Sequence, residues 1–70
     1  MNRERVRLAL SSTRDLAEVI NAMTEEEILK ALELESSAQR RKSVLTRLIG
    51  RLTHMREARW RNELMEQYLP

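Results

Sequence analysis

The sequence predicts an all-helical fold, because the chain is short, has almost no turn residues and lacks the residues that build strands. Its 70 residues leave room for one domain, spanning 1–70. It has one glycine, Gly50, and one proline, Pro70, and its only aromatic residues are Trp60 and Tyr68. A sandwich or barrel needs turn signals about every 8–12 residues and strands rich in aromatic and β-branched residues. We therefore expect helices throughout.

The first element is expected to be one helix over about 2–22. Apolar and small residues recur on one face of such a helix: Val6, Ala9, Leu10, Thr13, Ala17 and Ile20. A second interpretation begins a shorter helix at Ser12, because Ser12 followed by Asp15 resembles a capping pair. The continuous helix is favoured, since neither proline nor glycine interrupts residues 1–22.

A second helix is expected over about 25–35. Thr24 and Glu27 have the spacing of a capping box, in which each side chain bonds to the other residue's backbone amide. An unbroken helix beyond residue 35 would place Leu32 and Leu45 about 220° apart, on nearly opposite faces. A turn at residues 36–37, with Ser36 capping the next helix, removes this conflict.

The third helix is expected over about 38–68, a length of roughly 46 Å at 1.5 Å per residue. It carries an apolar stripe, interpreted as core or dimer seam: Leu45, Leu48, Ile49, Leu52 and Met55. The two shorter helices are expected to fold antiparallel against this long helix. That register pairs Leu29 with Leu45, Glu25 with Ile49, Leu10 with Leu64, and Val6 with Tyr68.

The small apolar content predicts a homodimer. Without the six alanines and Met1, only 22 larger apolar side chains remain to form a core. A monomer of this size is marginally stable unless a disulfide, a metal or a second subunit supports it. The chain has no cysteine, which excludes disulfides and thiolate zinc sites. We therefore expect a second copy to supply the missing burial.

The charges are distributed unevenly, although the net charge is only +2. Residues 25–37 carry five acids and one lysine, whereas residues 38–61 carry eight cations and one acid. Eleven of the thirteen cations are arginine, whose planar fork suits carboxylates and phosphates alike. The fold-back places the acidic segment beside the basic one, so part of the asymmetry is expected to be internal ion pairing.

The sequence contains no arrangement typical of an enzyme. It lacks a glycine-rich phosphate loop, a nucleophile elbow and any group of acids with histidine at metal-ligand spacing. Glu25, Glu26 and Glu27 are consecutive, so on a helix they point about 100° apart and cannot converge on one ion. We expect a non-enzymatic protein without cofactor or metal. No apolar run could span a membrane or form a signal peptide, and a cytoplasmic location is expected.

The end of the long helix carries the candidate partner-binding site. Trp60, Leu64 and Tyr68 form an i, i+4, i+8 row. The proposed site adds the neighbouring Met65 and the surrounding arginines Arg56, Arg59 and Arg61. These residue types are enriched at the centres of protein interfaces. The row either packs on Val6 and Leu10 of the first helix or binds a partner, and the leading hypothesis is an inhibitor or adaptor of another protein.

A competing hypothesis is nucleic-acid binding through an arginine face of the long helix. This face comprises Arg40, Arg47, Arg51 and Arg61, which fall within roughly 80° on a helix and could follow a phosphate backbone. The pattern fits neither a helix-turn-helix, whose recognition helix is shorter, nor a basic zipper, whose basic region precedes its leucines. A charged face opposite an apolar stripe is also typical of any solvated amphipathic helix.

Two stretches of the chain resemble a known group of phage proteins. They are Met23-Thr24-Glu25-Glu26-Glu27-Ile28-Leu29-Lys30-Ala31-Leu32-Glu33-Leu34-Glu35, and Arg40-Arg41-Lys42-Ser43-Val44-Leu45 with Leu48-Ile49-Gly50-Arg51-Leu52. Together they are similar to small helical proteins encoded early by transposable, Mu-like phages. Such proteins often bind and inhibit host proteins, including transcription regulators. The resemblance implies a regulatory interaction protein and identifies no functional residue.

Overall fold

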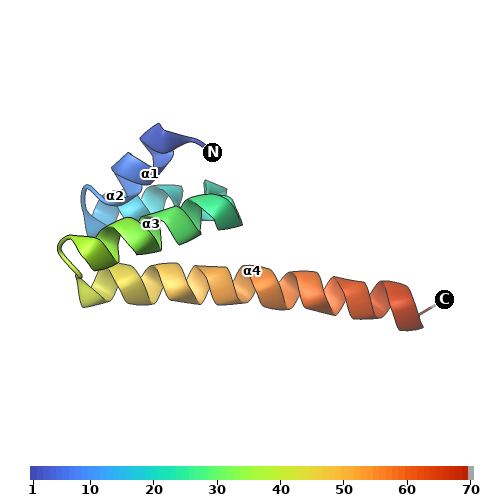
Figure 1. Cartoon of the computed structure of the whole chain (residues 1–70). Coiled ribbons are helices and arrows are strands. Elements are labelled where there is room, and N and C mark those ends of the chain that lie inside the picture. Colours follow the sequence, from blue (N-terminus) through green and yellow to red (C-terminus); the bar gives the residue numbers. More distant parts are fainter. Residues whose placement is uncertain (70) are drawn as a thin grey trace.

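The computed structural model describes residues 1–69, which are helical with short connections and contain no strand (Figure 1). The elements are α1 (Arg3–Ala9), α2 (Thr13–Val19), the 3₁₀ turn η1 (Ile20–Ala22), α3 (Glu25–Ser37) and α4 (Lys42–Tyr68). The all-helical class is therefore confirmed. None of the helices in residues 1–69 is long and apolar enough to cross a membrane.

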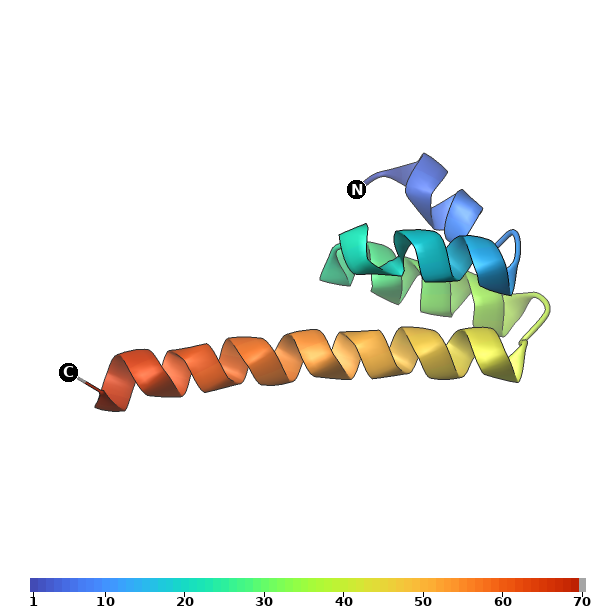
Figure 2. The same cartoon turned by 180° about the vertical axis from the view of Figure 1, so that it is seen from behind.

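The helices form a small bundle at one end of a long rod. α1 packs on α2 and α3, while α4 packs on α3, α2 and η1 from the opposite side (Figures 1 and 2). The second half of α4 extends far past the other helices, and the molecule measures 47 × 21 × 19 Å. The bundle therefore uses only part of the longest helix.

The single helix predicted over 2–22 is wrong, because the chain breaks after Ala9 and restarts at Thr13. Ser12 accepts a hydrogen bond from the Asp15 backbone N–H at 3.1 Å, as the alternative interpretation required. On the other side of the break, the Ser11 hydroxyl donates to the carbonyls of Arg7 and Leu8. Two adjacent serines thus form hydrogen bonds with backbone groups at both new helix ends, which lowers the free-energy cost of the break.

The capping box that begins α3 is confirmed, but the predicted turn at residues 36–37 is wrong. The hydroxyls of Ser36 and Ser37 both donate to the Glu33 carbonyl, so α3 continues through Ser37. The chain turns at 38–41 instead, and α4 begins at Lys42 rather than at 38. Within this turn Arg40 takes the left-handed conformation, with φ of 53°.

The core gathers apolar residues from every element. They are Val6, Ala9, Leu16, Ile20, Met23, Ile28, Ala31, Val44, Leu48 and Leu52. Leu48 and Leu52 were expected there, whereas Ile49 is 53% exposed and the fully buried Val44 was missed. Thr13 and Ala17 are also exposed, because the break after Ala9 turns Leu16 toward the core in their place.

The predicted register between the two arms of the chain is also wrong. Glu25 forms an ion pair with Arg59 at 2.9 Å rather than lying beside Ile49. Val6 is buried in the bundle, whereas Tyr68 is 72% exposed near the far end of α4. The register shifts because the turn lies later in the chain and is longer than predicted, and because the break after Ala9 folds α1 back onto α2 and α3.

Gly50 lies in an exposed turn of α4, and a β-carbon built there would meet nothing within 4 Å apart from its chain neighbours and the adjacent backbone of its own helix. Glycine in a helix interior is less stable than alanine by about 0.5–1 kcal/mol. We expect Gly50→Ala to raise the free energy of unfolding by that amount, as measured by urea titration followed by circular dichroism. A lower stability, or a loss of self-association, would instead show that another chain crosses closely at Gly50.

Candidate interaction surface

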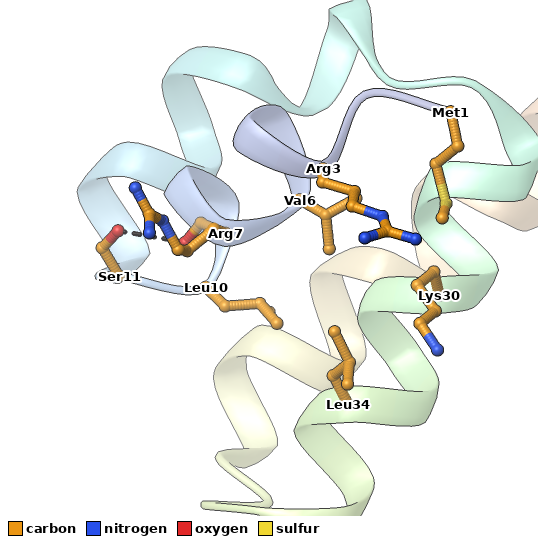
Figure 3. A pocket seen from close by; sticks show the side chains of 8 residues that line it. All are labelled: Met1, Arg3, Val6, Arg7, Leu10, Ser11, Lys30 and Leu34. Carbon is orange, nitrogen blue, oxygen red and sulfur yellow. Dashed lines mark hydrogen bonds between the residues drawn. The ribbon is translucent and has the colours of Figure 1, made fainter.

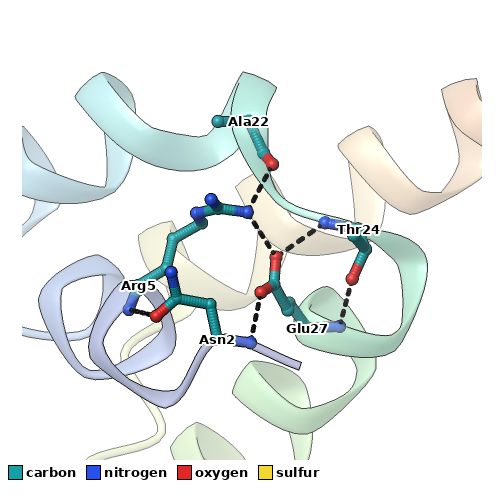
Figure 4. A network of polar contacts seen from close by, with 5 residues as sticks. All are labelled: Asn2, Arg5, Ala22, Thr24 and Glu27. Atoms are coloured by element: carbon teal, nitrogen blue, oxygen red, sulfur yellow. Dashed lines mark hydrogen bonds and ion pairs between the residues drawn. The ribbon is translucent and has the colours of Figure 1, made fainter.

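The acidic side chain of Glu27 joins the start of α3 to the start of α1 (Figure 4). Its Oε1 accepts the Thr24 backbone N–H at 2.9 Å and the Arg5 Nη1 at 3.0 Å. Its Oε2 accepts the Asn2 backbone N–H at 2.7 Å. The same Arg5 nitrogen donates to the Ala22 carbonyl at 2.9 Å. A carboxylate whose side chain is only 2% exposed is thereby fully partnered.

Glu35 forms a similar hydrogen-bond network at the C-terminal end of α3, where it joins α3 to the turn before α4. Its Oε2 accepts the Arg41 backbone N–H at 2.8 Å and Nε at 3.0 Å, and its Oε1 accepts Nη2 at 3.0 Å. Arg41 Nη2 also donates to the Leu10 carbonyl at 2.6 Å, which lies at the end of α1. This two-point contact lowers the pKa of Glu35 and raises that of Arg41.

These two networks were not predicted as structural centres, although the sequence contains a trace of them. Glu27, Ala31 and Glu35 recur at i, i+4 and i+8, so they share one face of α3. All three are buried, beside Ile28. Acids spaced like core residues on an otherwise amphipathic helix are the signal that could have identified them.

The arm, defined here as residues 56–69, has almost no cover from the rest of the chain. Trp60 is 64% exposed, Met65 48%, Tyr68 72% and Leu69 57%. Only Leu64 is partly buried in this segment. Leu64 points about 160° away from the buried Leu48, so the Trp60–Leu64–Tyr68 row faces away from the bundle. The structure therefore does not place this row on Val6 and Leu10.

The three arginines of the predicted partner site differ in their surroundings. Arg59 is held by Glu25 across the base of the arm, with its side chain 58% exposed. Arg56 and Arg61 are exposed and form no ion pair within residues 1–69. Trp60 is therefore flanked by two cations that remain free to meet an acidic surface.

The predicted arginine face is retained only in part. Arg40 lies in the turn before α4, so the helical spacing that grouped it with the others does not apply. Arg47 and Arg61 are exposed, while Arg51 is half-buried and its Nε is buried without a hydrogen-bond partner. None of these arginines forms an ion pair within the described chain. The expected internal pairing involves only Arg41 and Arg59 of the basic segment.

A groove of ≈ 760 Å³ between α1 and α3 was not predicted (Figure 3). Its apolar lining includes Val6, Leu10 and Leu34, whose side chains point into the space between the two helices. Its cations are Arg3, Arg7 and Lys30, and Met1 and Ser11 complete the lining. The groove lies within the volume range of ligand pockets, about 300–1,000 Å³, and its lining contains no histidine, aspartate or glutamate.

No metal-binding cluster is present among residues 1–69. Comparisons with protein-family models, with curated proteins and with solved structures find no match to this chain. Three surfaces of the described chain are candidates for binding: the arm, the arginine face and the groove between α1 and α3.

The Glu27 network predicts a loss of stability in acid. Hydrogen bonds from the backbone N–H groups of Thr24 and then Asn2, with a smaller contribution from Arg5, outweigh burial and lower the pKa of Glu27 to about 2. A carboxyl with a depressed pKa in the folded state stabilises the fold above its unfolded value of 4.5. That stabilisation is lost as the pH falls from about 4.5 toward 2.

We expect Glu27→Gln to lower the urea midpoint at pH 7 and to reduce its fall between pH 7 and pH 3. Glu35 also has a lowered pKa, so part of the acid dependence should remain. The control is Glu26→Gln, in the same helical turn but exposed. Equal urea midpoints for the two variants across this pH range would contradict a central role for Glu27.

Proposed function

We propose that this protein is a non-enzymatic interaction module whose arm docks onto a partner protein, as an inhibitor or adaptor of, for example, a transcription regulator. The observation that carries the proposal is the exposure of Trp60, Met65 and Tyr68 on a helix that extends beyond its own core. Large exposed apolar groups with a polar fringe mark interaction sites. Among the described residues, Trp60, Met65 and Tyr68 are not part of the buried core.

The form of the arm favours one mode of recognition. An amphipathic helix binds a partner by laying an apolar row, spaced i, i+3 or i+4, into a groove. Trp60, Leu64 and Tyr68 provide such a row, and Arg56 and Arg61 flank it with unpaired positive charge. The favoured partner surface is therefore an apolar groove with an acidic border. A homodimer forms part of this proposal, because ten buried apolar residues make a small core.

The double variant Trp60→Ala with Tyr68→Ala tests the arm. Both side chains are mostly exposed, so we expect the circular dichroism spectrum and melting temperature to stay close to those of the wild type. Loss of two interface anchors should weaken partner binding by about 30-fold or more. The measurement is affinity capture of the tagged chain from its native host, followed by titration of the captured protein.

The matched control is Leu29→Ala, because Leu29 is also exposed, at 44%, but lies on α3. It should leave capture unchanged. If the Trp60/Tyr68 double variant unfolds, these residues are core and the site is assigned wrongly. If it folds and still captures the same protein at wild-type affinity, the arm is not the binding element.

Nucleic-acid binding is the second candidate function, and one observation favours it. Residues 38–61 carry eight cations, and within the described chain only Arg41 and Arg59 are neutralised by ion pairs. Arg47 and Arg61 are exposed on α4, a helix about 40 Å long at 1.5 Å per residue. Exposed, unpaired arginines along a rod can release counterions from a phosphate backbone.

A gel-shift experiment with duplex DNA at two salt concentrations separates the two functions. If α4 contacts phosphates, affinity should fall steeply with salt, and Arg47→Ala should reduce the salt slope by roughly 0.9. Arg14→Ala, which removes an exposed arginine of α2, is the charge-matched control and should change the slope little. Absence of a shift at low salt would eliminate this function.

A further inference from the structure

We infer that two copies of this chain exchange α1, so that α1 of each copy occupies the position that α1 of the other copy holds in the single chain. The exchange gives a definite form to the homodimer that belongs to the proposed function, and to that extent it rests on that proposal. Three observations carry the inference: the short connection between α1 and α2, the absence of helix-breaking residues there, and the contacts that hold α1 in the bundle.

The connection between α1 and α2 consists of residues 10–12. α1 runs toward this connection and α2 runs back from it beside α1 (Figures 1 and 2). Leu10 stays in the right-handed helical region, with φ of −91° and ψ of −3°, and the Ser11 N–H donates to the Leu8 carbonyl at 3.1 Å. Ser12 is extended, with φ of −161° and ψ of 164°. A change of Ser12 to helical angles would therefore bring α1 and α2 close to one line.

The residues of this hinge tolerate both conformations. Residues 1–22 contain neither glycine nor proline, so nothing there opposes a helical Ser12. In the single chain the Ser12 side chain caps α2 by accepting the Asp15 N–H at 3.1 Å. A helical hinge loses this cap, but it gives the first N–H groups of α2 carbonyl partners in α1. A short hinge with two such closely balanced forms favours the exchange of the element that it carries.

The contacts of α1 define what must fill its position. Val6 and Ala9 are 3% and 0% exposed in the core. The buried carboxylate of Glu27 receives two of its three hydrogen bonds from the Asn2 N–H and from Arg5 (Figure 4). If α1 left without a replacement, Glu27 would be a buried charge short of donors, which is strongly destabilising. α1 of a second copy supplies the same apolar groups and the same donors.

The contact at the C-terminal end of α1 is also compatible with exchange. The Leu10 carbonyl accepts Arg41 Nη2 at 2.6 Å in the single chain. A carbonyl oxygen has two lone pairs, so in the exchanged form it can accept both the Arg14 N–H of its own helix and the arginine of the other copy. Each copy gives one α1 and receives one, so the contact closes with two-fold symmetry and produces a dimer. The balance between the two forms then depends on the hinge and on concentration.

Analytical ultracentrifugation of the full chain and its Thr13→Pro variant tests the hinge. Thr13 is the first residue of α2, where proline is favoured, and proline keeps the preceding Ser12 extended. In a joined helix the same proline would lack an N–H and clash with the Ala9 carbonyl. Thr13→Pro should therefore keep the circular dichroism spectrum of the single chain and raise the dimer dissociation constant at least 100-fold. Thr13→Ala is the control at the same exposed position and should dimerise like the wild type.

Ser12→Ala should shift the balance in the opposite direction. It removes the cap of α2, which only the single-chain form uses, and alanine is the better helix former. Because each dimer contains two hinges, the dimer dissociation constant should fall by about tenfold or more. Substitutions at two adjacent residues should thus move the monomer–dimer equilibrium in opposite directions.

Nuclear magnetic resonance of a mixed dimer identifies the exchanged element directly. One copy is labelled with ¹³C and the other is unlabelled, and an isotope-filtered experiment records only the proton contacts between copies. These contacts should join Val6 of one copy to Lys30 and Leu34 of the other, because the three residues line one groove in the single chain.

Several outcomes would overturn the inference. One is a wild-type chain that stays monomeric at millimolar concentration. Another is a Thr13→Pro variant that dimerises as tightly as Thr13→Ala, which would show that the hinge does not change on dimerisation. A third is a dimer whose contacts between copies involve only the arm. None of the hinge variants alters residues 56–69, so the Trp60/Tyr68 capture experiment still decides separately whether the arm binds a partner.

Discussion

Two buried carboxylates on α3 determine how the bundle closes. A buried charge destabilises a protein unless donors surround it, and the carboxylates of Glu27 and Glu35 each accept three hydrogen bonds. The donors to Glu27 come from the start of α1 and from Thr24, the N-cap of α3, and those to Glu35 come from Arg41 in the turn before α4. Because Arg41 also bonds to the Leu10 carbonyl, the second network needs α1 to end where it does. The break after Ala9 and the turn at 38–41 are thus linked through one arginine.

This closure also explains why the arm is left uncovered. Arg41 fixes where α4 begins against α3, and Arg59 pairs with Glu25 at the start of α3. The 13 residues of α3 can lie beside only the first part of a 27-residue helix. α1 and α2 cannot extend this cover, because the break folds them back over α3. Everything after Arg59 therefore projects from the bundle, with its apolar row facing away from the core.

Features of the fold that depend on local residue patterns were predicted correctly from the sequence. Predictions were wrong where contacts between distant residues determine the structure. The capping box at Thr24 and the need for a turn before Leu45 followed from spacing and helical phase alone. For residues 2–22 the local pattern allowed both one helix and two, because the Ser12–Asp15 capping pair competed with a continuous apolar face. The contact from Arg41 to the Leu10 carbonyl, which holds the end of α1, joins distant parts of the chain and cannot be read from local spacing. Local sequence also did not determine the role of Ser36. A serine hydroxyl can cap a new helix or donate to a carbonyl within a continuing one, and Ser36 donates to the Glu33 carbonyl. In the candidate surface, the Trp60 row was predicted from its spacing and is exposed in the structure, while its role as a binding site stays a prediction. The groove between α1 and α3 could not be predicted, because it depends on the break after Ala9.

The arm is helical without tertiary support because α4 has already been nucleated by the bundle. An isolated helix shorter than about 12–15 residues is marginal in water, since its first turn is costly to form. Extending an existing helix adds one hydrogen bond for each residue fixed. The core contacts of Val44, Leu48 and Leu52 stabilise the first part of α4, and the arm can then extend this helix without core contacts of its own. Its exposed Trp60 and Tyr68 contribute little burial to folding of the single chain, and their apolar area stays available for association. The bundle thus holds the arm as a preformed helix, so the docking that we propose would require little further ordering of the chain.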